Sequence, residues 1–144
     1  MIEPGIGTEK FKLGSFSDEM SSYLSLATDI ELREPFKIYK TKFVWFFFNR
    51  TTDKLEQLSL FTGFNEKVLD KVGIGDSYKR LVGELGACRK TDGVFEQEKL
   101  DGISFELNDN KSIECISVSV PYQFYGELPD HIHRNLKKGR KKLP

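Results

Sequence analysis

The stretch "FFFNRTTDKLEQLSL", residues 46–60, recurs later in the chain as "FELNDNKSIECISV", residues 105–118. In both copies an apolar segment ends at an asparagine, a short polar turn follows, and a second apolar segment begins. The matched positions are Phe46 with Phe105, Phe48 with Leu107, Asn49 with Asn108, Leu55 with Ile113, Glu56 with Glu114, Leu58 with Ile116, Ser59 with Ser117 and Leu60 with Val118. Alternation of this kind is typical of strands, and Asn and Asp are typical of hairpin turns. The repeat therefore predicts the same β-hairpin twice.

The similarity continues upstream into two segments that each contain a glycine corner. "FKLGSFSDEM", residues 11–20, aligns with "VGIGDSYKRL", residues 72–81, and places Gly14 opposite Gly75. A phosphate-binding GxGxxG loop would have a third glycine where this chain has Tyr78, and no P-loop lysine follows. We therefore interpret both glycines as sharp turns from a strand into a helix. The expected N-caps are Ser15 or Ser17 in the first copy and Asp76 or Ser77 in the second.

Each copy is expected to fold as a β-α-β-β-β unit. The expected strands cover residues 6–13, 35–40, 43–49 and 54–61 in the first copy and residues 67–73, 94–98, 102–107 and 112–120 in the second. The two tandem repeats, about 6–61 and 67–120, predict an α+β fold in which one antiparallel sheet has two helices packed on one face. Residues 1–130 would form this single domain, and the basic segment 131–144 a flexible tail.

The composition is that of a compact domain. Of the 144 residues, 38% are hydrophobic and 12 are phenylalanines, which is enough to form a packed core. The longest apolar run, residues 43–48, is far too short to span a membrane. The N-terminal "MIEPGIG" has no basic region followed by an apolar stretch, and Cys88 and Cys115 have no metal-binding spacing. We expect a cytoplasmic protein with two buried, reduced thiols.

The sequence offers little for catalysis or metal binding. The only histidines, His131 and His133, could bind zinc together with Asp130, but two solvated side chains near a terminus are the simpler interpretation. Glu96 and Glu98 could form a metal-binding or acid/base pair on one strand face, but a solvated face is the simpler interpretation. We predict no enzymatic activity, no catalytic residue, no metal site and no cofactor.

Charge is distributed unevenly along the chain, although the net charge is zero. The last eleven residues, "RNLKKGRKKLP", carry +6, and the rest of the chain therefore carries about −6. Residues 91–132 are the most acidic part and would attract a basic protein while repelling nucleic acid. The candidate partner-binding residues are the acids Asp92, Glu96, Glu98, Asp101, Glu106 and Asp109, with Trp45 or Phe47 as an apolar anchor if their face is open.

Three segments also resemble a known class of protein. "PGIGTEKFKLGSFSDEM", "GIGDSYKRLVGELG" and "DGISFELNDNKSIECISV" resemble small bacterial immunity proteins encoded beside contact-dependent growth inhibition and related polymorphic toxins. The resemblance covers most of the chain. It implies a non-enzymatic, stoichiometric inhibitor that binds the C-terminal domain of a toxin, often a nuclease, inside the producing cell. No site residue is transferred from the family, because no motif marks one.

Two other functions remain open at this stage. A nucleic-acid-binding module could use the aromatic strand "FVWFFF" for base stacking and the basic tail for phosphate contacts. A pocket between the two copies could hold a small ligand or support a weak enzyme. The sequence also leaves open whether the chain dimerises through "KFVWFFFN", residues 42–49.

Overall fold

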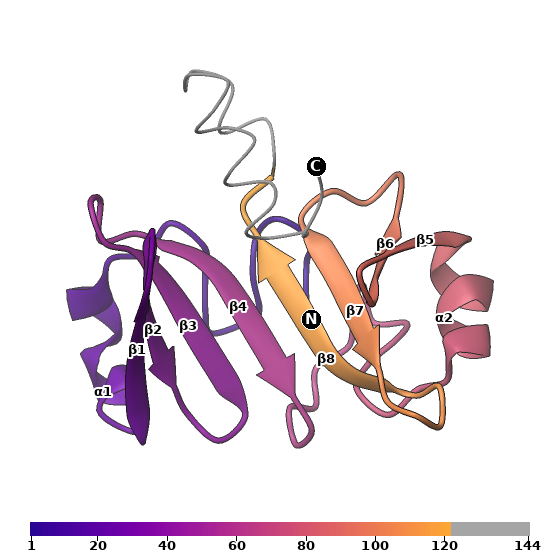
Figure 1. Cartoon of the computed structure of the whole chain (residues 1–144), viewed down its shortest axis with the longest axis horizontal. Helices are drawn as coiled ribbons and strands as arrows, with labels where there is room; N and C mark the ends of the chain where they lie inside the picture. Colours follow the sequence, from indigo (N-terminus) through magenta and orange to yellow (C-terminus); the bar gives the residue numbers. More distant parts are fainter. Residues whose placement is uncertain (122–144) are drawn as a thin grey trace.

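The computed structural model describes residues 1–121; the expectations for the basic tail and for both histidines lie outside the described residues. The first half contains η1 (Ser17–Met20), α1 (Ser21–Leu24), β1 (Asp29–Arg33), β2 (Phe36–Lys40), β3 (Val44–Asn49) and β4 (Leu55–Phe61). The second half contains α2 (Tyr78–Leu85), β5 (Cys88–Thr91), β6 (Val94–Gln97), β7 (Ile103–Leu107) and β8 (Ile113–Ser119). All eight strands form one antiparallel sheet in the order β1-β2-β3-β4-β8-β7-β6-β5 (Figure 1). Each half is thus a short helical segment followed by a four-stranded meander.

The two meanders meet at β4 and β8, where the internal repeat becomes a twofold arrangement. Ser59 lies directly opposite Ser117, its own counterpart in the repeat, and the two hydroxyl oxygens are 3.0 Å apart. Next to this pair, Leu58 faces Val118, which is the counterpart of Leu60, and the same exchange holds on the other side. A pseudo-twofold axis therefore passes between the two serines.

The glycine corners follow the same symmetry. Gly14 has a φ of 91°, and its N–H donates to the carbonyl of Leu55 at 2.7 Å. Gly75 has a φ of 94°, and its N–H donates to the carbonyl of Ile113 at 2.8 Å. Because both amides are bound to the first residue of a strand, they are not available to a phosphate. Each glycine fastens the chain before a helix to the last strand of its own half.

The helix caps differ between the two halves. Ser77 caps α2, and its hydroxyl accepts a hydrogen bond from the N–H of Arg80 at 3.0 Å, as predicted for the second copy. In the first copy the residue before η1 is Phe16, whose N–H donates to the carboxylate of Glu19 at 2.8 Å. The serine caps predicted there are therefore wrong, and the glutamate replaces them.

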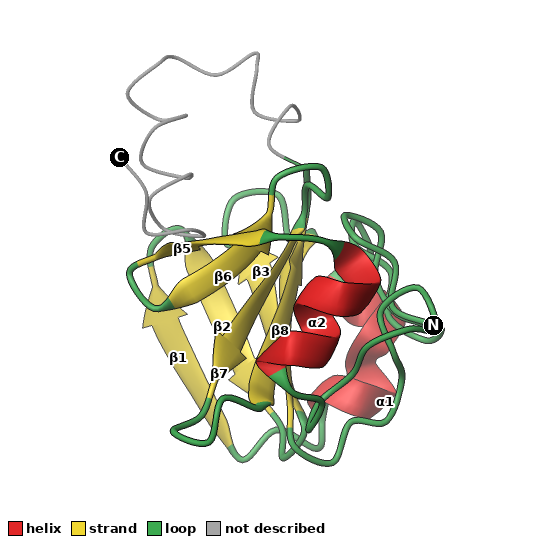
Figure 2. Ribbon diagram, turned by 90° about the vertical axis from the view of Figure 1, so that its right-hand side faces the viewer, coloured by secondary structure: helices red, strands yellow, loops and turns green. Residues whose placement is uncertain are grey.

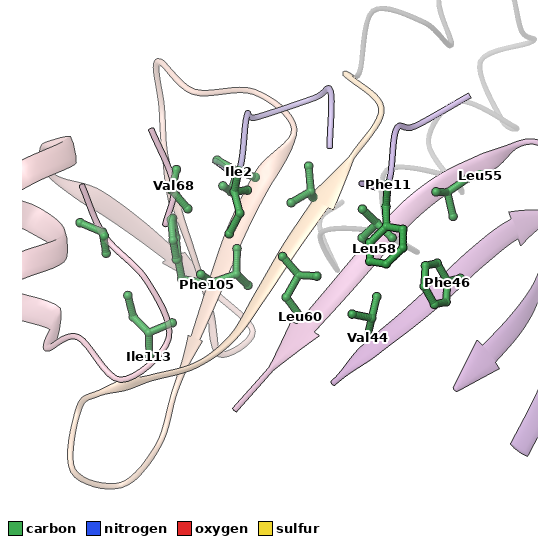
Figure 3. Packing of buried hydrophobic residues seen from close by; sticks show 14 of the residues in the cluster. Ile2, Phe11, Val44, Phe46, Leu55, Leu58, Leu60, Val68, Phe105 and Ile113 are labelled. Atoms are coloured by element: carbon green, nitrogen blue, oxygen red, sulfur yellow. The ribbon is translucent and has the colours of Figure 1, made fainter. Parts of the chain in front are cut away.

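The main hydrophobic core lies on the side of the sheet that carries the helices (Figure 2). Strand residues alternate into it, and Figure 3 shows Phe105 near the loop residues Ile2 and Val68, and Leu58 and Phe46 near the loop residue Phe11. The helical segments contribute three buried side chains, Met20, Leu24 and Leu81. The loops contribute four, Ile2, Phe11, Val68 and Val72. Loops therefore close this core at least as much as helices do.

The predicted α+β fold of two β-α-β-β-β repeats is wrong. The protein is mostly an eight-stranded antiparallel sheet, and its helical segments η1, α1 and α2 have only four, four and eight residues. A helix of one or two turns cannot cover a meander of four strands, so the two helices do not form a packed layer. β1 and β5, at the two edges of the sheet, were not predicted.

The segments predicted as the first strand of each copy are loops. Residues 6–13 and 67–73 make only isolated bridges, such as Gly7 with Lys12. Gly7 has a φ of 136°, and a Cβ at this position would come within 2.1 Å of the carbonyl oxygen of Phe11. The chain therefore folds back on itself there and cannot extend as a strand.

Alanine substitutions at the two corners test their role. Gly14→Ala and Gly75→Ala should each lower the free energy of unfolding by about 1–3 kcal/mol, the usual cost of a left-handed backbone in a residue with a side chain. A Cβ at either position meets nothing within 4 Å, so backbone strain is the only cost. Urea unfolding followed by circular dichroism measures the change.

Gly83→Ala is the matched control. A Cβ there also meets nothing within 4 Å, but Gly83 lies within α2 and has no positive φ. Alanine should stabilise the helix by up to about 1 kcal/mol. Equal effects at all three glycines would contradict the corner interpretation.

Candidate functional site

The face of the sheet opposite the main core is here called the second face. One row of residues crosses it through five adjacent strands: Lys40, Trp45, Ser59, Ser117 and Ser104. Residues directly opposite one another in a sheet point to the same side, so this row is continuous across both halves. The second face therefore presents one surface made from the first and the second repeat.

The first half of the second face is aromatic and aliphatic. Phe36, Ile38 and Phe47 form a small buried cluster, and the rings of Phe36 and Phe47 meet edge to face at 5.7 Å. Trp45 packs against this cluster, half-buried, with its ring 5.0 Å from that of Phe61. Only 6% of Phe47 is exposed, so it is a packing residue and not an accessible anchor.

Lys40 packs over the ring of Trp45. Its Nζ lies 4.2 Å from the centre of the Trp45 ring, within the range of a cation–π interaction. The same ammonium lies 2.7 Å from a carboxylate oxygen of Glu31 on β1. Trp45 is therefore held between an apolar cluster and a paired cation.

The second half of this face is polar and acidic. Phe95 and Phe105 are paired across β6 and β7 and belong to the main core side. Their chain neighbours therefore point the other way, which places Glu96 and Glu106 together on the second face. Glu106 is exposed, whereas Glu96 is only 8% exposed. Two of the six predicted acids thus lie on the same face as Trp45, and of these two Glu106 is the accessible one.

The other four predicted acids lie in turns at the two ends of the second half. Asp92 is in the β5–β6 turn and Asp109 in the β7–β8 turn, which are at the same end because adjacent strands are antiparallel. Glu98 and Asp101 are in the β6–β7 connection at the opposite end. The structure therefore surrounds the β6–β7 hairpin with carboxylates and does not gather all six into one cluster.

Cys115 lies beside this acidic surface, but its thiol is unreactive. It is opposite Glu106 in the sheet and only 6% exposed. Burial, together with the nearby charge of Glu106, raises the pKa of the Cys115 thiol to about 12. Burial also raises the pKa of Cys88, which packs against the main core. Both thiols stay protonated at neutral pH, and neither is suited to nucleophilic chemistry.

Glu31 is the most strongly perturbed acid in the described part of the chain. The guanidinium of Arg33, at 2.7 Å, and the ammonium of Lys40 lower the pKa of Glu31 from 4.5 to about 2. Because the folded-state pKa is depressed, this pairing stabilises the fold at pH above about 4.5 and is lost as the pH falls through about 2.

An NMR titration of the Glu31 carboxyl carbon tests this assignment. The midpoint should lie near pH 2 in the unmodified protein and move up toward 4.5 in a Lys40→Met variant, which removes one of the two cations. Lys42→Met is the matched control, because Lys42 lies over the ring of Phe43 instead. A wild-type midpoint near 4.5 would show that the two cations do not hold the carboxylate.

The structure also contains an aromatic groove that no sequence pattern predicts. It has a volume of about 350 Å³ and lies on the core side, between the N-terminal loop, α1 and the loop after β4. Its apolar lining comes from distant segments: Phe11, Tyr23, Leu26, Phe43, Val44, Phe46 and Phe64. No periodic pattern connects these residues, so only the tertiary structure brings them together.

The aromatic strand "FVWFFF" does not form a stacking surface. Phe46 and Phe48 are each 1% exposed in the main core, and Phe47 is buried on the second face. Only Phe43, 40% exposed, and the half-buried Trp45 remain accessible. Base stacking, which needs open aromatic faces, receives little support from this strand.

Two features are absent from the described residues. No group of three or more His, Cys, Asp or Glu within residues 1–121 could hold a metal ion. No helix in that range is both long and apolar enough to cross a membrane.

Comparison with known proteins assigns no family. No family model matches the chain, and no curated protein matches it. One match among solved structures is a cysteine-rich secretory protein from Staphylococcus aureus subsp. aureus Mu50, with 13% sequence identity and a TM-score of 0.46. The match covers 81% of this chain and 45% of that protein, so the chain spans less than half of its length. At this level of similarity the match carries no information on function.

Proposed function

We propose that this chain is an immunity-type inhibitor, which binds and neutralises a basic toxin domain, such as a nuclease, in the cytoplasm of the producing cell. The observation that carries the proposal is the arrangement of acids around the β6–β7 hairpin. Glu106 is exposed on the second face, Asp92 and Asp109 are exposed at one end, and Glu98 and Asp101 at the other; Glu96 lies on the same face as Glu106 but is only 8% exposed, so it is not part of the accessible surface.

This arrangement suits a cationic partner that covers the second half of the sheet. Such a partner would meet carboxylates from the face and from both ends, so its lysines and arginines need not converge on one point. Complementary charge of this kind raises the association rate and selects against acidic partners. A polyanion such as RNA would be repelled by the same surface.

Trp45 supplies the apolar element of the proposed contact. It lies on the same face as Glu106. The serines between them have short, polar side chains, which leave room for a partner at the centre of the sheet. Buried aromatics are over-represented among the residues that dominate protein interfaces. A partner seated across the second face would bury Trp45 at one side and pair its cations with the acids at the other. Inhibition by such a contact is stoichiometric and requires neither a catalytic residue nor a cofactor.

The first test is co-expression and pull-down with the protein encoded immediately upstream, at several salt concentrations. The unmodified chain should form a one-to-one complex and suppress toxicity. Glu106→Lys reverses an exposed charge and should weaken binding at least about tenfold, with the larger effect at low salt.

Glu84→Lys is the matched control. Glu84 is an exposed acid in α2, on the other side of the sheet, so the same charge reversal should leave binding unchanged. Equal losses for both variants would mean that net charge alone drives the association. A chain that retains no protein and instead binds RNA or DNA at low salt would overturn the proposal.

A further inference from the structure

The two edges of the sheet are β1 and β5, and they are built differently. Among residues 1–121, β1 pairs only with β2, so its outer side presents backbone N–H and C=O groups to solvent. A free edge of this kind is a template for another strand, and proteins usually protect it with a charged side chain or by covering it.

The β5 edge carries such protection on the core side of the sheet. Cys88 packs against the main core, and the Nζ of Lys90 lies 5.4 Å from the centre of the Phe95 ring. The β1 edge has no charge at its core-side positions. They are Ile30, which is 51% exposed, and Leu32, which is 61% exposed. Of the two edge strands, β1 therefore combines a free edge with exposed aliphatic side chains, and β5 does not.

The charges of β1 lie on the other side, in a self-complementary order. The strand reads Asp29-Ile30-Glu31-Leu32-Arg33, with an acid at its first position and a base at its last. A copy running antiparallel, with Glu31 opposite Glu31, pairs Asp29 with the partner's Arg33 on the second face. It pairs Ile30 with the partner's Leu32 on the core side. All five residues of each strand take part in this register.

We propose that the chain forms a twofold dimer in which β1 pairs antiparallel with β1 of a second copy, with the two Glu31 residues at the centre. The two sheets then become one continuous sheet. β1 lies at the outer edge of the first half (Figure 1), so the acidic β6–β7 hairpin of each copy stays at the far end of its sheet and is not covered. This inference is independent of the proposed inhibitor function.

The central pair of like charges is compensated within each copy. Glu31 is bound by Arg33 and Lys40 at 2.7 Å each, and Lys40 also lies 3.8 Å from Asp29. Each copy therefore contributes two acids and two bases to the centre of the dimer, and the charges balance. Four aliphatic side chains leave water on the core side, which provides the favourable term. Because strands of five residues form a small interface, the dimer should depend on concentration.

Analytical ultracentrifugation of the whole chain over a range of concentrations is the first experiment. The unmodified protein should show a reversible monomer–dimer equilibrium. Leu32→Lys, which gives β1 the kind of charge that β5 carries, should raise the dissociation constant at least about tenfold. Since Leu32 is largely exposed, the variant should unfold at the same temperature as the unmodified protein. Lys90→Thr, at the opposite edge, is the matched control and should leave the equilibrium unchanged.

Cysteine cross-linking tests the register. Chains carrying Ile30→Cys and chains carrying Leu32→Cys, with tags of different size, are mixed and oxidised at pH 8. In the proposed register these two positions are opposite each other, whereas like positions are diagonal and about 7–8 Å apart, too far for a disulfide. Disulfides should therefore join unlike chains. Native Cys115 and Cys88 have raised pKa values, and the unmodified protein serves as the oxidation control.

Three results would overturn the proposal. The first is a protein that stays monomeric at every concentration, and the second is a dimer that Leu32→Lys does not weaken. The third is a cross-link that forms mainly between like chains, because it would place a different residue at the centre. None of these results bears on toxin binding, which the Glu106→Lys and Glu84→Lys variants test separately.

Discussion

The pairing of β4 with β8 is the contact on which the rest of the structure depends. Each half alone is a four-stranded meander with two edges and a helical segment too short to cover it. Joining the halves at Ser59 and Ser117 removes one edge from each and places Leu58 opposite Val118 and Leu60 opposite Ile116 in a single core. Within the β4–β8 pairing, the hydroxyl pair at the axis occupies the one position where a residue meets its own copy, and two serines fit there because either hydroxyl can donate to the other.

The backbone has kept the twofold symmetry, whereas the second face has lost it. The glycine corners and the β-bulges recur in both halves: the register shifts after Phe47 in β3 and after Glu106 in β7. Phe47 and Glu106 therefore occupy matching places, yet one is buried in an apolar cluster and the other is exposed and acidic. Backbone hydrogen bonds constrain both copies alike, while surface side chains are free to diverge. On the second face, the first half therefore carries an apolar cluster and the second half a charged surface.

The strands that carry the repeat could be predicted from the sequence because their apolar residues alternate into one core. The predicted ranges 43–49 and 102–107 agree with β3 and β7 to within one residue at each end. β1 alternates too, as Asp29-Ile30-Glu31-Leu32-Arg33, but its run of five residues holds only two apolar side chains and lies outside the matched repeat, and it was not predicted. The sequence shows that the acids are concentrated in the second half but not where they lie in space, since Asp92 and Glu98 are close in sequence and lie at opposite ends of β6.

The sequence by itself determined the duplication, the hairpins and the two corners, because these depend on local backbone geometry and on neighbours a few residues apart. Only the tertiary structure decided that loops close the core at least as much as helices do, since that depends on how far helices of four and eight residues reach across a sheet. It also decided that Trp45 shares a face with Glu106, and that β1 rather than β5 has an exposed aliphatic edge. Those relations are set by strand order and register, which join residues far apart in the chain.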